Sequence, residues 1–158
     1  MKTVIVYVDN QGAIEKIARL IGNALPVSKV TLINLKKTDT CNLENYDVVI
    51  LGSSAQSLRT NREMRSFINR NVWTLLRKEL GLYVYDSQHH NTAHLPDFAF
   101  PDELKAHSKS CRVIGRPPDY QSIGFIDKLL ARRRQRSLEN ESDINTAHLN
   151  TFIEEMLR

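Results

Sequence analysis

The sequence has little cysteine and no long apolar run. Its 158 residues include only two cysteines, Cys41 and Cys111, which argues against a disulfide framework and for a reducing compartment. No apolar stretch approaches the roughly 20 residues that cross a bilayer. Lys2 leads into a short apolar run that soon turns polar, unlike a secretory signal. We therefore expect a cytoplasmic protein that folds as a single domain over residues 1–158.

Net positive charge is also absent outside one segment. The net charge of the chain is +4, whereas residues 112–136 contain seven Lys or Arg and two Asp, a local charge of +5. The positive charge is therefore local, which indicates one basic face or one acidic partner. Its arginine cluster, Arg132–Arg136, has no interleaved aromatic residue, and the segment contains no known nucleic-acid module, so we expect no nucleic-acid binding.

Apolar runs typical of strands alternate with helical spacing along the chain. Short β-branched runs predict five strands, at residues 2–8, 30–35, 46–54, 80–86 and 111–115. Apolar residues at helical spacing predict helices over 14–25, over 64–76 with Asn61 as its cap, and over a short piece at 102–107. The alternation predicts a doubly wound, five-stranded parallel sheet in a three-layer α/β/α arrangement.

A last helix is predicted at the C-terminus. Its cap is expected at Ser142 or Asp143. The residues expected on its apolar face are Ile144, Ala147, Phe152, Ile153, Met156 and Leu157.

Ligands of open parallel sheets bind at the carboxyl ends of the strands. Here that edge is formed by residues 9–14, 53–61 and 86–94. The first of these turns opens a helix, so backbone N–H groups and the helix dipole favour an anion there. Every strand-to-helix turn shares this arrangement, so the turn alone leaves both a phosphate site and an ordinary turn open.

The motif "NYDVVILGSSAQS", together with Gly12 and Gly52, resembles the flavodoxin-like family. The segments "RTNREMRSFINRN" and "GRPPDYQSIGFIDKLLARRRQRS" are similar to the bacterial menaquinone-dependent protoporphyrinogen oxidases of that family, most specifically over Tyr120–Ser137. The resemblance covers nearly the whole chain. It implies a flavodoxin-like redox protein that binds FMN and transfers electrons.

The resemblance also implies which residues hold the cofactor. The FMN phosphate would lie at the first turn and the flavin ring between the turns after the third and fourth strands. The residues so assigned are Asp9, Asn10, Gln11, Gly12, Ala13 and Ile14 for the phosphate, and Ser53, Ser54, Ala55, Gln56, Asp86, Ser87, Gln88 and His89 for the ring.

This chain departs from the family at both parts of the site. The family's phosphate turn offers several Ser or Thr hydroxyls, but here only Gly12 matches. A hydrogen bond to a charged group contributes roughly 1.5–3 kcal/mol, so the loss of two or three hydroxyls is expected to weaken the binding of FMN by several powers of ten. Asp9 adds a like charge, although the amides of Asn10 and Gln11 can donate.

Residues 53–66 also lack an aromatic residue to stack on the flavin ring. The second hypothesis is therefore a flavodoxin-fold module that has lost FMN and acts through protein or membrane contacts.

Two other kinds of site are weaker. His89, His90 and His94 near Asp86 offer metal-binding side chains, but their spacing matches no known motif and we expect no metal. Ser53 lacks the G-x-S-x-G elbow of hydrolases. No side chain is nominated as an acid or base catalyst.

An amphipathic segment with a cationic end lies at residues 123–136. One interpretation is that Lys128–Arg136 contacts an acidic membrane surface or an acidic protein, as a quinone-type acceptor would imply, and gives the protein a peripheral membrane location. The other is a helix packed on the sheet with solvated arginines at its C-terminal end.

Overall fold

A computed structural model describes residues 1–9, 12–26, 29–55, 62–86, 99–115 and 144–158. Five parallel strands form one sheet in the order β2-β1-β3-β4-β5. The three inner strands are short apolar runs whose side chains are buried on both faces, as expected for a parallel sheet covered by helices, whereas the two edge strands are only partly buried. The strands are β1 (Lys2–Tyr7), β2 (Lys29–Asn34), β3 (Val48–Ser54), β4 (Glu79–Asp86) and β5 (Ser110–Gly115).

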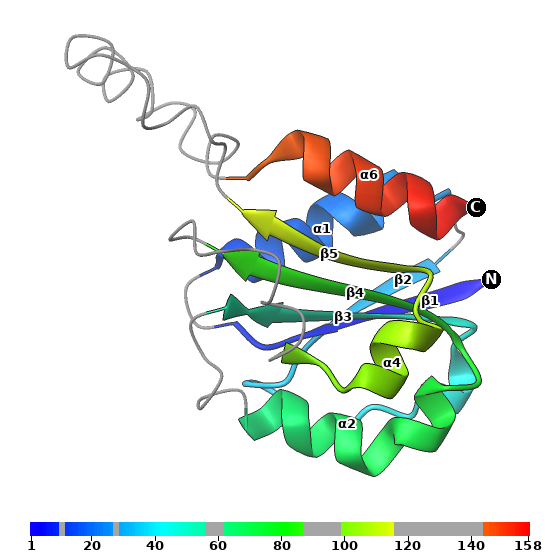
Figure 1. Cartoon of the computed structure of the whole chain (residues 1–158). Helices are drawn as coiled ribbons and strands as arrows, with labels where there is room; N and C mark the ends of the chain where they lie inside the picture. Colours follow the sequence, from blue (N-terminus) through cyan, green and yellow to red (C-terminus); the bar gives the residue numbers. More distant parts are fainter. Residues whose placement is uncertain (10–11, 27–28, 56–61, 87–98, 116–143) are drawn as a thin grey trace, which may run out of the picture.

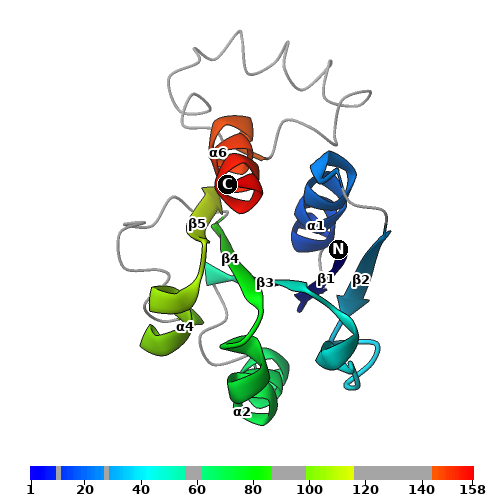
Figure 2. The same ribbon diagram turned by 90° about the vertical axis from the view of Figure 1, so that its right-hand side faces the viewer.

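Helices cover both faces of the sheet (Figures 1 and 2). On one face lie α1 (Ala13–Ala24) and α6 (Thr146–Leu157), and on the other lie α2 (Arg62–Leu75) and α4 (Asp102–His107). A 3₁₀ turn, η1 (Leu43–Asn45), precedes β3. Because all strands are parallel, their carboxyl ends meet at one edge (Figure 1). Among the described residues, no helix is both long and apolar enough to cross a membrane.

The two faces of the sheet carry separate apolar cores. Alternate residues of each strand point to opposite faces, so Val4 and Leu51 pack under α2 whereas Ile5 and Ile50 pack under α1. These four side chains are fully buried. The register of the strands is therefore fixed, because a shift of one residue would exchange the two cores.

Two strand glycines allow large side chains to pack on the α1 face. A Cβ at Gly52 would overlap the ring of Tyr83, the residue beside it on β4. A Cβ at Gly81 would meet Phe152 and Met156 of α6. Tyr83 and Phe152 pack edge to face, with ring centroids 6.0 Å apart. The missing side chains thus make room for the Tyr83 ring beside Gly52 and for α6 over Gly81 of β4.

The predicted fold class is confirmed, including the short helix at 102–107, and the strand bounds differ by two residues or fewer. Two details of the last helix were wrong. Its cap is Asn145, whose Oδ1 accepts from the His148 N–H at 3.2 Å; Ser142 and Asp143 lie outside the described residues, as does Asn61. Ala147 and Leu157 are exposed, because the apolar stripe runs instead through Leu149, Phe152 and Met156.

Candidate functional site

The strand order brings the three predicted segments to one edge. β1, β3 and β4 are neighbours in the sheet, so Asp9, Ser54 and Asp86 follow or end adjacent strands. Ala13 and Ile14 form the first turn of α1, where Ile14 is buried. The other predicted residues, Asn10, Gln11, Gln56, Ser87, Gln88 and His89, lie outside the described residues, and so do His90 and His94.

The carboxylate of Asp9 folds back onto the N-terminus of α1. Its Oδ1 accepts a hydrogen bond from the Gly12 N–H at 3.0 Å, and its Oδ2 accepts one from the Glu15 N–H at 2.8 Å. Gly12 precedes the helix with φ 93°, a left-handed conformation that favours glycine. A side-chain anion thus occupies backbone donors at the positive end of the helix.

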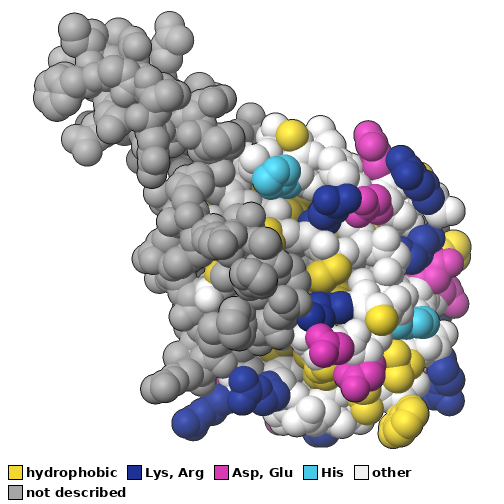
Figure 3. Space-filling view, viewed as in Figure 1, with side chains coloured by type: hydrophobic (Ala, Val, Ile, Leu, Met, Phe, Trp, Pro, Cys, Tyr) yellow, Lys and Arg dark blue, Asp and Glu magenta, His cyan; other side chains and the backbone are white. Residues whose placement is uncertain are grey.

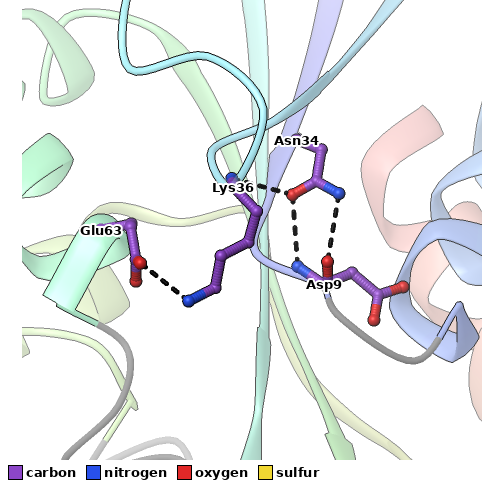
Figure 4. Close-up of polar contacts among 4 residues, drawn as sticks. All are labelled: Asp9, Asn34, Lys36 and Glu63. Carbon is purple, nitrogen blue, oxygen red and sulfur yellow. Dashed lines mark hydrogen bonds and ion pairs between the residues drawn. The ribbon is translucent and has the colours of Figure 1, made fainter.

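Asn34, the last residue of β2, fixes the backbone of Asp9 (Figure 4). Its Oδ1 accepts from the N–H groups of Asp9 at 3.3 Å and of Lys36 at 3.0 Å, and its Nδ2 donates to the Asp9 carbonyl at 3.2 Å. Lys36 in turn pairs with Glu63 at the start of α2, with Nζ 2.7 Å from Oε1. Figure 4 shows the Asp9 carboxylate directed away from Asn34 and toward α1.

Phenol and carboxyl groups lie beneath the first turn of α1. The Tyr83 hydroxyl, fully buried, donates to the Ile14 carbonyl at 3.1 Å, and burial, then the charges of Tyr7 and Asp9, raise its pKa well above the ordinary value. Burial and the nearby Glu15 carboxylate raise the pKa of Tyr7 to about 12. Glu15 is itself paired with Arg19 at 2.7 Å, which lowers the pKa of Glu15. Two acidic side chains thus lie at this turn.

The described residues on the ring side are largely enclosed. Ser53 and Asp86 are 0% and 1% exposed, and Ala55 is 8% exposed. Ser54 is half-buried, and Ser53, Ser54 and Asp86 each have an interaction partner. No group of three metal-binding side chains occurs in the part of the chain that the structure describes.

A family model described as the flavodoxin domain matches residues 4–145. The chain belongs to the flavodoxin domain family. None of the curated protein sequences matches it significantly.

The fold is also similar to that of solved flavodoxins. A short-chain flavodoxin associated with a non-canonical PDU bacterial microcompartment is 14% identical, with 99% of this chain and 97% of that chain covered and a TM-score of 0.60. Oxidised flavodoxin 1 from Bacillus cereus is 15% identical, with 72% of this chain and 79% of that chain covered and a TM-score of 0.54. Oxidised flavodoxin 2 from the same organism is 22% identical, with 72% of this chain and 80% of that chain covered and a TM-score of 0.53. At these identities the similarity concerns the fold alone.

The flavodoxin family implies FMN, but the described turn does not fit its phosphate. A phosphate at the α1 N-terminus needs the amides that point there, and the Asp9 carboxylate takes those of Gly12 and Glu15. With Asp9 in place, the phosphate would also meet a like charge. In the described part of the turn, two of the amides that a phosphate would use are thus already bonded to the chain's own carboxylate.

The sequence interpretation missed two residues of this site. Asn34 lies 25 residues from its partner Asp9, and its only signal is a polar side chain at the end of an apolar strand, beside the first turn. Tyr83 lies within the fourth predicted strand, and a phenol that is buried needs a hydrogen-bond partner. That partner is a carbonyl of α1, 69 residues away.

Proposed function

We propose that this flavodoxin-domain protein has lost dependence on FMN and acts through contacts with other proteins. The observation that carries the proposal is the pair of hydrogen bonds from Gly12 and Glu15 to the Asp9 carboxylate. They give the helix N-terminus an anion of its own, so in the described part of this turn two of the N–H groups that a phosphate would use are already bonded.

The energetic cost of replacing this carboxylate can be estimated. A capping Asp stabilises a helix by roughly 0.5–2 kcal/mol, and about 1.4 kcal/mol is a factor of ten in affinity. The need to displace Asp9 therefore weakens phosphate binding by a factor of roughly 2 to 30. The acidic surroundings weaken it further, because the displaced Asp9 and the nearby Glu15 remain close to the phosphate.

Titration with FMN tests the proposal. We expect the purified protein to be colourless and to bind no FMN at micromolar concentration. Asp9→Thr removes the charge, frees the two amides and adds a hydroxyl, so this variant should bind FMN at least tenfold more tightly, by roughly 1.4 kcal/mol.

Asp47→Thr is the matched control. Asp47 also accepts a backbone hydrogen bond, from the Lys2 N–H at 2.8 Å, but at the amino end of the sheet. This variant should behave like the wild type. Wild-type protein that is purified with flavin or binds it at micromolar concentration would overturn the proposal.

The second candidate function is FMN-dependent electron transfer, in the manner of the menaquinone-dependent protoporphyrinogen oxidases. Membership of the flavodoxin family favours it, because the family match includes the first turn. When bound, the flavin itself would carry the electrons. A wild-type flavin spectrum is the result that would select this function.

The basic segment Lys128–Arg136 provides a further proposed contact, with an acidic protein or an acidic membrane surface. It lies outside the described residues. Flotation with anionic liposomes tests the membrane contact. Equal recovery of wild type and an Arg132→Ala/Arg133→Ala/Arg134→Ala variant would exclude a contribution of these arginines to membrane binding.

A further inference from the structure

The outer face of α2 has the composition of a protein-binding surface. Its apolar side chains Met64, Phe67, Ile68 and Leu75 are buried against the sheet. Trp73, the only tryptophan of the chain, is nevertheless 79% exposed. Trp and Arg are the residues most enriched among those that dominate binding energy at interfaces, and the α2 face combines them.

Helical spacing aligns the exposed residues of α2 in one row. At 3.6 residues per turn, residues 62, 66, 70 and 73 fall on the same side of the helix. We call this row, Arg62, Ser66, Arg70 and Trp73, the α2 face. Figure 3 shows Lys and Arg side chains toward both ends of the lower edge of the molecule, where α2 lies in Figure 1, and others higher on the same face.

A groove runs beside this row. Two adjoining pockets of about 340 and 510 Å³ lie between α2 and the segment after β2, and both are lined by Asp39 and Arg70. Phe67 and Cys41 add apolar surface to the larger pocket. A partner's apolar side chain can therefore be accommodated next to the basic row.

The arginines on and beside this face differ in their contacts with acidic side chains. Arg70 donates to the Ser66 and Asp39 carbonyls, each at 3.3 Å. Arg77, two residues beyond the end of α2, is paired with Glu44 at 3.0 Å. Within the described segments, neither Arg62 nor Arg70 forms an ion pair with a carboxylate. Both arginines are exposed, so an acidic surface would complement them.

We propose that the α2 face docks an acidic segment of a partner protein, with carboxylates on Arg62 and Arg70 and an apolar side chain against Trp73 and the groove. The inference rests on the proposed function, whose protein contacts it assigns to α2. A second copy of the chain is disfavoured because an α2-to-α2 contact would oppose arginines. A membrane is disfavoured because the apolar face of α2 is buried, leaving one indole for insertion.

The single tryptophan makes a direct test possible. Trp73 emission reports on α2 alone, so the protein is titrated with three probes: a synthetic peptide of alternating glutamate and leucine, phosphatidylglycerol vesicles, and a single-stranded oligodeoxynucleotide. We expect the peptide to shift the emission to shorter wavelength at low ionic strength and to lose affinity as salt is added. A response to vesicles or oligonucleotide but not to the peptide would overturn the proposal.

Variants locate the binding surface. An Arg62→Ala/Arg70→Ala variant should bind the peptide at least about tenfold more weakly, as should Trp73→Ala followed by calorimetry. The control is Arg19→Ala/Arg158→Ala, which removes the same charge from α1 and the C-terminus on the other side of the sheet, and should bind within twofold of wild type. Equal loss in both double variants would overturn the proposal. The peptide titration contains no FMN. Failure of the α2 proposal and failure of the proposed loss of FMN binding therefore give different experimental results.

Discussion

Replacing Asn34 with Ala should destabilise the protein more than replacing any other described asparagine that accepts a backbone hydrogen bond. The Asn34 side chain is 8% exposed and makes three hydrogen bonds to the main chain of Asp9 and Lys36, at 3.0–3.3 Å. Each such bond contributes a net 0.5–1.5 kcal/mol, so Asn34→Ala should cost about 2–3 kcal/mol. The loss of stability should be large because the main-chain groups of Asp9 and Lys36 that lose their partner are partly buried.

Two other asparagines serve as matched controls. Asn42 accepts only from the exposed Glu44 N–H, and Asn145 caps α6 through the His148 N–H, so each Ala variant should cost roughly 1 kcal/mol or less. Urea unfolding followed by circular dichroism gives the free energies, with an unchanged m-value as the two-state check. Hydrogen exchange should show faster exchange of the Lys36 amide in Asn34→Ala alone. Equal losses in all three variants, with the Lys36 amide still protected, would refute the role of Asn34.

Three further changes have defined outcomes in the same unfolding assay. Tyr83→Phe should lower the free energy of unfolding by about 1 kcal/mol because the Ile14 carbonyl loses its buried donor. Gly52→Ala should lower it by about 1–3 kcal/mol because the added Cβ overlaps the Tyr83 ring. A variant as stable as the wild type would contradict the corresponding contact. The Arg112 guanidinium lowers the pKa of Glu155 to about 2, so Glu155→Gln should cost about 1 kcal/mol at neutral pH, after allowing for the 46% exposure of Arg112. This difference should persist above pH 4.5 and vanish as the pH falls to about 2; a constant difference would contradict it.

The layers of the fold could be predicted because hydrophobic periodicity determines them. Strand runs such as the one around Ile50 are buried on both faces, and only helices on both sides of a parallel sheet can cover them. The start of α6 could not be predicted as well. Ser142, Asp143 and Asn145 are all good capping residues, and local propensity does not distinguish among them. The structure selects Asn145, which places Leu149 under the helix and leaves Leu157 at the surface.

The chemistry of the first turn was harder to predict, because it depends on the direction of one side chain. The sequence places an acid at position 9, and that acid can either repel a phosphate or point away from it. The structure shows a third arrangement, in which the carboxylate binds the amides of Gly12 and Glu15. It depends on Asn34, which comes from another strand and holds the Asp9 backbone. Contacts of this sequence separation have no local signature.

The missing hydroxyls and the acid at position 9 therefore have a common explanation. A hydroxyl-rich turn leaves its amides to an external anion, whereas Asp9 supplies an anion attached to the chain. A tethered group competes at an effective concentration of roughly millimolar or more, far above a micromolar ligand. An external phosphate must thus overcome both this local concentration and the charge of the carboxylate it displaces. Adding hydroxyls around an intact Asp9 would leave both obstacles in place, so changing Asp9 itself is the step that should restore phosphate binding.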